Sequence, residues 1–134
     1  MIMEKQIAAL ASDEQHIVMW DIDSLLKDLA SAPSVSVPTK KLVPQEWLTI
    51  DEAYAKTTDP AKPVLLFELP ENKAYVADGN HRLYRAAAEE IPEMKVVFVP
   101  EETHLKYLFR CSAAEYYDVI RALMTEHVFI DSPF

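Results

Sequence analysis

The chain has 134 residues, of which 50% are hydrophobic, and it carries a formal net charge of −9 at pH 7. This length suits one buried core and is short for two, so we expect a single domain spanning residues 1–134. The acidic composition makes DNA and RNA unfavourable partners, and the lone Cys111 excludes the disulfide framework of a small secreted domain.

The first third of the chain is predicted to contain two helices, a strand and a long loop. Residues 3–12 have helix-forming composition, and residues 16–20 form an apolar run typical of a strand. A brief helix capped by Asp23 or Ser24 is expected next. Residues 31–44 contain several prolines and many small polar residues, so we expect a loop there.

The middle of the chain carries the clearest helix and strand signals. Thr49 and Glu52 have the spacing of a capping box, which predicts that a helix begins there. Residues 63–69 and 74–77 are predicted to be two strands joined by a turn-rich tetrapeptide, which is the pattern of a β-hairpin. Residues 80–90 then have helical composition.

The last third of the chain predicts one more strand and two more helices. Residues 94–99 form an apolar strand, and a short helix is expected after Pro100. Ser112 and Glu115 form a second capping box, which predicts a helix that runs to about residue 127. Together these elements indicate an α+β fold with a small mixed β-sheet and surrounding helices.

The hydropathy of the chain predicts its localisation. No part of the sequence approaches the roughly 20 consecutive apolar residues that a membrane-spanning helix needs. The opening residues mix charged and apolar side chains, unlike the apolar core of a signal peptide. We therefore expect a cytoplasmic protein without a signal sequence, and we expect no membrane partner.

Glycine is unusually scarce in this chain. Ordinary usage would give about nine glycines in this length, whereas the sequence contains one, Gly79. Glycine adopts positive φ angles easily and lets other groups approach the backbone closely. The turn at Gly79, between a predicted strand and a predicted helix, is therefore the first candidate for a functional site.

The residues around this turn predict an anion site. A helix leaves its first N–H groups unpaired and concentrates partial positive charge there, so a strand-turn-helix segment can receive a phosphate. Gly79 and Asn80 form the turn, and His81, Arg82 and Arg85 follow within two helical turns. Cations at a helix N-terminus oppose the helix dipole by about 0.3–1 kcal/mol each, and a bound anion would account for their presence.

A structural alternative exists for each of these residues. Asp78 could cap the helix, while Arg82 and Arg85 could pair with Glu89 or other surface acids. In the functional interpretation, His81 is a phosphate donor or a general acid or base, because the dipole favours its neutral form. Asp78 would then orient a neighbouring side chain, hold a divalent cation or accept a proton from a substrate.

Residues 75–87, which read YVADGNHRLYRAA, and the strand that follows them resemble the central motif of the ParB/sulfiredoxin-like superfamily. The resemblance covers residues 60–100. It implies that Gly79, Asn80, His81 and Arg82 contact nucleotide phosphates. Members of that superfamily include CTP-hydrolysing partition proteins, sulfiredoxins that use ATP, a free-serine kinase and ParB-like nucleases.

Departures from the superfamily pattern narrow the expected activity. Sulfiredoxins place a catalytic cysteine just before the His-Arg pair, whereas this chain has Asn80 there, so sulfinic-acid repair is excluded. Partition proteins carry an arginine-bearing motif before this region and a helix-turn-helix after it. Residues 33–44 contain no arginine, and about 35 residues follow the motif, so DNA partition is not expected.

The sequence therefore predicts a nucleotide- or phosphate-binding ParB-like domain. Phosphoryl transfer or nucleotide hydrolysis extends this hypothesis, with Asp78 and His81 as catalytic residues. Gly79, Asn80, His81, Arg82 and Arg85 would bind an ATP- or CTP-type nucleotide, with Mg²⁺ as an accompanying ion and no metal site of the protein's own. The alternative is a non-catalytic module that keeps the fold and binds a protein partner or a second copy of itself. A third and less favoured hypothesis is that the chain is a ParB-like nuclease.

Overall fold

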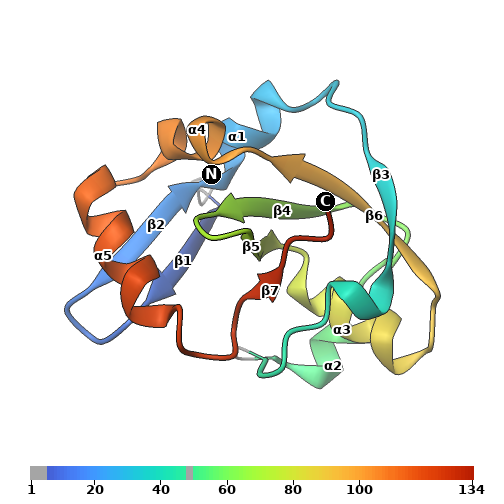
Figure 1. Cartoon of the computed structure of the whole chain (residues 1–134). Helices are drawn as coiled ribbons and strands as arrows, with labels where there is room; N and C mark the ends of the chain where they lie inside the picture. Colours follow the sequence, from blue (N-terminus) through green and yellow to red (C-terminus); the bar gives the residue numbers. More distant parts are fainter. Residues whose placement is uncertain (1–5, 48–49) are drawn as a thin grey trace. The chain divides into compact units, whose positions relative to one another are not determined.

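The computed structural model describes residues 6–47 and 50–134 (Figure 1). The chain divides into two compact units, which we describe separately. One unit comprises the chain up to Ala32 together with Pro100–Thr125. The other comprises Pro33–Val99 and Glu126–Phe134. The expectation of a single domain stays a prediction.

The first unit contains a two-stranded antiparallel sheet. Strand β1 (Ile7–Ala11) pairs with strand β2 (Ile17–Asp21). The predicted strand at residues 16–20 is confirmed, but the helix predicted at 3–12 is wrong where it is described, because residues 7–11 form β1. Alanine and leucine favour helices locally, and pairing with β2 overrides that weak preference.

The described part of the first unit also contains three α-helices, and the first and the last of them begin at a side-chain cap. Helix α1 (Ile22–Asp28) begins after Asp21, whose Oδ1 accepts a 3.0 Å hydrogen bond from the Ser24 amide. The brief helix is thus confirmed, with its cap at Asp21. Helices α4 (Glu101–His104) and α5 (Ala113–Leu123) follow later in the chain, joined by the 3₁₀ turn η2 (Leu105–Tyr107) and a short loop.

The capping box predicted at Ser112 is confirmed at the start of α5. The Ser112 hydroxyl accepts from the Glu115 amide, and the Glu115 carboxylate accepts from the Ser112 amide, both at 3.1 Å. These two bonds satisfy N–H groups that would otherwise lack partners at the helix end. The helix ends at Leu123, before the predicted limit at residue 127.

An aromatic cluster lies in the core of the first unit. Trp20, His104 and Tyr116 are fully buried, with 0% of each exposed. The Trp20 indole N–H donates to His104 Nδ1 at 3.3 Å, and the Trp20 and Tyr116 rings meet edge to face with their centres 6.0 Å apart. The hydroxyl of Tyr116 donates to Glu101 at 2.8 Å, so this polar tip is satisfied.

The second unit is built on a five-stranded sheet with the order β3-β6-β4-β5-β7. Strands β4 (Val64–Leu69) and β5 (Lys73–Asp78) form an antiparallel hairpin, which confirms the prediction for this segment. Helix α3 (Asn80–Ala88) follows β5 directly and leads to β6 (Glu93–Val99), which runs parallel to β4. Helix α2 (Glu52–Ala55) lies beside α3 (Figure 1).

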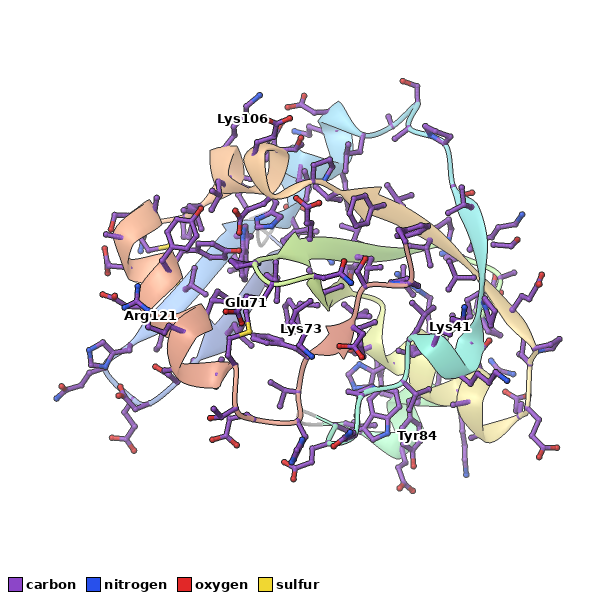
Figure 2. All side chains as sticks on the ribbon, in the orientation of Figure 1. Lys41, Glu71, Lys73, Tyr84, Lys106 and Arg121 are labelled. Atoms are coloured by element: carbon purple, nitrogen blue, oxygen red, sulfur yellow. The ribbon has the colours of Figure 1, made fainter. Side chains whose placement is uncertain are left out.

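Two strands of this sheet come from segments without a strand signal. Strand β3 (Val35–Pro38) pairs with β6 inside the predicted loop at residues 31–44, and the 3₁₀ turn η1 (Thr39–Lys41) follows it. Strand β7 (Ile130–Asp131) pairs with β5, and the Lys73 ammonium meets the Asp131 carboxylate at 2.6 Å (Figure 2). Both strands therefore form by pairing with strands that lie far away in the sequence.

Helix α2 begins later than its predicted capping box. Asp51 is the N-cap, and its Oδ1 accepts from the Tyr54 amide at 3.1 Å. Thr49, the predicted cap, lies outside the described residues. Asp51 supplies the same kind of oxygen acceptor two residues further along the chain.

The core of the second unit lies between its sheet and helix α3. The residues that form this core are each at least nine-tenths buried: Val37, Leu42, Val64, Leu66, Ala74, Val76, Leu83, Ala86, Met94, Val96 and Ile130. Leu83 and Ala86 are the contributions of α3, and both are fully buried. Burial of this face orients α3 and leaves its other faces for the candidate site.

The α+β class is therefore confirmed, with strands and helices in both units. Among the described helices, none has the length and apolarity required to cross a membrane.

One testable consequence of burial in the second unit concerns alkaline pH. Burial raises the pKa of Tyr75 on β5 from 10.0 to about 12. The unfolded chain releases this phenol proton near pH 10 while the folded chain retains it, so stability should fall as the pH rises from 10 to 12. The expected slope is about 1.4 kcal/mol per pH unit.

Replacing Tyr75 with phenylalanine should remove this contribution. Urea unfolding at several pH values between 9 and 11 would measure it, as the difference in slope between wild type and Tyr75→Phe. Other titrating groups remain in both proteins and cancel in that difference. If the free energy of unfolding changes with pH in the same way in both proteins, the raised pKa of Tyr75 is contradicted.

Candidate anion site at the start of helix α3

Gly79 occupies the N-cap position of α3 in a left-handed conformation, with φ of 103° and ψ of 18°. A side chain at this position would be strained, because its Cβ would lie 2.6 Å from Val64 Cγ1 and 2.7 Å from Arg82 Nη2. Gly79 itself has no side chain with which to cap the helix. The backbone N–H groups of the first turn therefore receive no acceptor from the N-cap residue.

The side chains of Asn80 and His81 each form a hydrogen bond with a backbone group outside α3. The Asn80 side-chain amide donates to the Val76 carbonyl at 2.8 Å, which ties the first turn of α3 to β5. His81 Nε2 accepts from the Asp51 amide at 3.2 Å, and the His81 ring meets the Tyr54 ring edge to face at 4.9 Å. Acceptance at Nε2 requires a neutral ring with its proton on Nδ1.

Arg82 folds back over the glycine turn. Its Nη2 donates to the Pro63 carbonyl at 3.0 Å and lies 3.5 Å from Asp78 Oδ2. Its Nε is buried and, within the described part of the chain, has no hydrogen-bond partner. The guanidinium therefore lies close to the helix start, in contact with one carboxylate and one neutral carbonyl.

Arg85, one turn later, has a similar pair of contacts. Its Nη1 donates to the Thr58 carbonyl, and its Nε pairs with Glu89 at 2.5 Å. The two arginines therefore contact separate acids, and both hold the segment between α2 and β4 through backbone carbonyls. These are contacts that the structural alternative anticipated for Arg85 and Glu89.

Asp78 is the last residue of β5 and is mostly buried, with 24% of its side chain exposed. Its pairing with Arg82 neutralises much of the charge that would repel a phosphate. The acidic residue Glu68 lies on the neighbouring strand β4, where it pairs with Ala74, whereas Asp78 pairs with Leu65. Three residues of strand separate the two positions, or about 10 Å, so Glu68 does not join Asp78.

The residues do not form a metal site of their own. Among the described residues, no group of three or more histidine, cysteine, aspartate or glutamate side chains could hold a metal ion. Magnesium is usually held by one or two carboxylates together with waters and phosphates. Asp78 is the carboxylate nearest the glycine turn, and it already pairs with Arg82, so magnesium would have to arrive with the phosphates of a ligand.

Two residues from the segment before β4, Trp47 and Glu52, contact α3 and were not predicted from the sequence to belong to the site. The Tyr84 hydroxyl donates to Glu52 Oε1 at 2.9 Å, and the Tyr84 ring meets Trp47 at 5.4 Å (Figure 2). The hydrogen bond to Glu52 raises the pKa of Tyr84 above its usual value. In the sequence, the hint of this pairing is the aromatic residue Tyr84 inside a helix that carries basic residues. The sequence alone does not show which residues Tyr84 contacts.

Comparison of the chain with protein-family models, with curated proteins and with solved structures found no match.

Proposed function

We propose that this chain binds a nucleotide through its phosphates at the first turn of α3. The observation that carries the proposal is the turn before the helix, where a positive-φ glycine that has no capping side chain of its own occupies the N-cap position and Arg82 lies beside it. Such a helix start provides backbone N–H donors and partial positive charge for an oxyanion. The guanidinium of Arg82 lies beside Gly79 and adds a cation at the same place, which Asp78 partly balances.

We also propose a fold of the ParB/sulfiredoxin type for the second unit. The support is the order of its central elements, in which β5 passes through the glycine turn into α3 and then into β6. This is the arrangement that the motif at residues 75–87 implies. By this resemblance, the residues that would contact the phosphates are Gly79, Asn80, His81 and Arg82.

The present contacts of Arg82 are compatible with an incoming phosphate. A guanidinium binds phosphate more strongly than it binds a neutral carbonyl, because both partners are charged. Arg82 would therefore exchange its bond to the Pro63 carbonyl for bonds to phosphate oxygens. Its Nε, which has no described partner, would gain one.

Nucleotide hydrolysis or phosphoryl transfer is the catalytic extension of the proposal. In hydrolysis, a water oxygen would attack the terminal phosphorus while the bond to the bridging oxygen breaks, which releases inorganic phosphate. The Asp78 carboxylate would accept the proton that the water loses, or His81 would accept it at Nε2 after giving up its hydrogen bond from the Asp51 amide. Both side chains adjoin the glycine turn, at the end of β5 and in the first turn of α3.

A second candidate function is a non-catalytic interaction module. The contacts of His81, Arg82 and Arg85 with the segment before β4 favour it, since they give all three side chains a structural role without a ligand. The exposed Tyr54, with 56% of its surface accessible, would then belong to a contact surface for a protein partner or a second copy.

The test is ligand-induced thermal stabilisation in wild type, Arg82→Ala and Arg82→Lys. The ligands are ATP, CTP, GTP and inorganic phosphate, each with and without magnesium. A ligand at 100 times its dissociation constant should stabilise the folded chain by about 2.7 kcal/mol. We expect a shift for at least one nucleotide, its loss in Arg82→Ala, and partial retention in Arg82→Lys.

Arg121→Ala is the matched control, because Arg121 is an arginine on α5 with 78% of its side chain exposed. It should keep the full ligand-induced shift. The comparison uses the shift within each variant, so any loss of stability caused by the missing Pro63 contact cancels. No shift for any ligand at millimolar concentration would exclude nucleotide binding and favour the interaction module.

A further inference from the structure

A pocket lies between helices α2 and α3, on the side of α3 that carries Tyr84. Its volume is about 340 Å³, which is within the range of small-molecule sites. The residues that line it come from these two helices and the ends that follow them: Glu52, Ala55, Lys56, Tyr84, Arg85, Ala88 and Glu89. Of these residues, only Arg85 was predicted from the sequence to contact a ligand.

The chemistry of the lining combines an aromatic wall with both kinds of hydrogen-bonding group. Two carboxylates and two cationic side chains line the pocket, so its formal charge is zero. Ala55, Ala88 and the ring of Tyr84 supply apolar surface between them. A neutral balance disfavours a simple anion or cation and suits a planar ligand that carries both hydroxyl donors and acceptors.

The aromatic wall is held in place by its neighbours. Tyr84 donates to Glu52 through its hydroxyl and meets the Trp47 ring edge to face, so its ring has a defined orientation. The Glu89 carboxylate is also fixed in place, by its ion pair with Arg85. A ligand entering this pocket would meet groups that are already ordered, which lowers the entropy cost of binding.

The pocket and the anion site lie along one face of α3. His81, Tyr84, Arg85 and Ala88 follow the spacing i, i+3, i+4 and i+7, which places them on the same side of a helix. With a rise of 1.5 Å per residue, His81 and Ala88 are about 10 Å apart along the axis. One ligand of nucleotide length can therefore contact both the first turn of α3 and the pocket.

We infer that this pocket binds the nucleoside part of the nucleotide whose phosphates lie at the first turn of α3, an inference that rests on the proposed function. The base packs against the ring of Tyr84. Glu52 and Glu89 accept hydrogen bonds from ribose hydroxyls, because carboxylates are strong acceptors. Lys56 and Arg85 donate to the base or to the sugar oxygens.

The experiment measures dissociation constants by calorimetry for ATP, CTP, adenosine, cytidine and inorganic tripolyphosphate. Tripolyphosphate tests the phosphate site without a nucleoside. In wild type we expect at least one nucleotide to bind 10-fold or more tightly than tripolyphosphate. In Ala88→Trp, which fills the pocket from an exposed position, that difference should disappear while the affinity for tripolyphosphate stays unchanged.

Two further variants complete the design. Ala114→Trp places the same bulky side chain at an exposed alanine of α5 that does not line the pocket, and it should bind every ligand as wild type does. Glu52→Gln keeps the shape of the side chain and removes its charge, and it should weaken nucleotides several-fold without affecting tripolyphosphate. Circular dichroism confirms that each variant is folded.

The outcomes separate this inference from the proposed function. If tripolyphosphate binds in an Arg82-dependent manner but nucleotides bind no more tightly, or Ala88→Trp changes nothing, the pocket inference is overturned and the phosphate site stands. If nucleosides bind and Ala88→Trp abolishes their binding while tripolyphosphate does not bind, the pocket stands and the phosphate site is overturned. Failure of every ligand overturns both.

Discussion

Replacing Gly79 with alanine should lower the free energy of unfolding by about 3 kcal/mol. Two effects contribute. An L-residue in the left-handed region costs about 1–2 kcal/mol, and the φ of Gly79 is 103°. The new Cβ would also lie 2.6 Å from Val64 Cγ1, in a strand whose side chains are fully buried at that point, and overpacking of this kind costs about 1–3 kcal/mol.

Urea unfolding monitored by circular dichroism measures this loss. The double variant Gly79→Ala/Val64→Ala removes the colliding methyl group and should be less destabilised than the sum of the two single changes. A loss below about 1 kcal/mol for Gly79→Ala would show that the turn does not need glycine, and would weaken the anion site as well, since that site depends on the same backbone conformation.

Replacing Trp20 with alanine should lower the free energy of unfolding by about 3–5 kcal/mol, the usual loss for a large aromatic residue in a core. Trp20 is fully buried in the first unit, where it contacts the rings of His104 and Tyr116. Its removal leaves a cavity between two side chains that are themselves fully buried, and neither has exposed space into which it could relax.

Chemical unfolding tests this prediction with two matched variants. Trp47→Ala changes the other tryptophan of the chain, which is half-buried, and should cost clearly less. Trp20→Phe keeps most of the ring and removes the indole donor to His104 Nδ1, so it should cost about 1–3 kcal/mol. Equal losses for Trp20→Ala and Trp47→Ala would mean that the aromatic cluster is not the core of its unit.

The sequence alone predicted the elements whose signals are local. The hairpin of β4 and β5, the helix after Gly79, the strand β6 and the capping box of α5 all appear where their residues indicate. In each case the information lies within a few residues: alternating apolar side chains, a turn, or a serine and a glutamate three positions apart. Composition likewise predicted a glycine turn before helix α3, although the cap considered there was Asp78 and the residue at the N-cap position is Gly79.

Only the tertiary structure decided the elements that depend on distant partners. Residues 7–11 have helix-forming composition but become a strand because β2 pairs with them, and β3 and β7 exist through β6 and β5. The same applies to the candidate site. The sequence placed Arg82 and Arg85 on α3, but the carbonyls they contact, and the α2 wall that faces Tyr84, come from a segment some 20 to 30 residues away. No local pattern encodes such pairings, because their energy is gained only when the chain has folded.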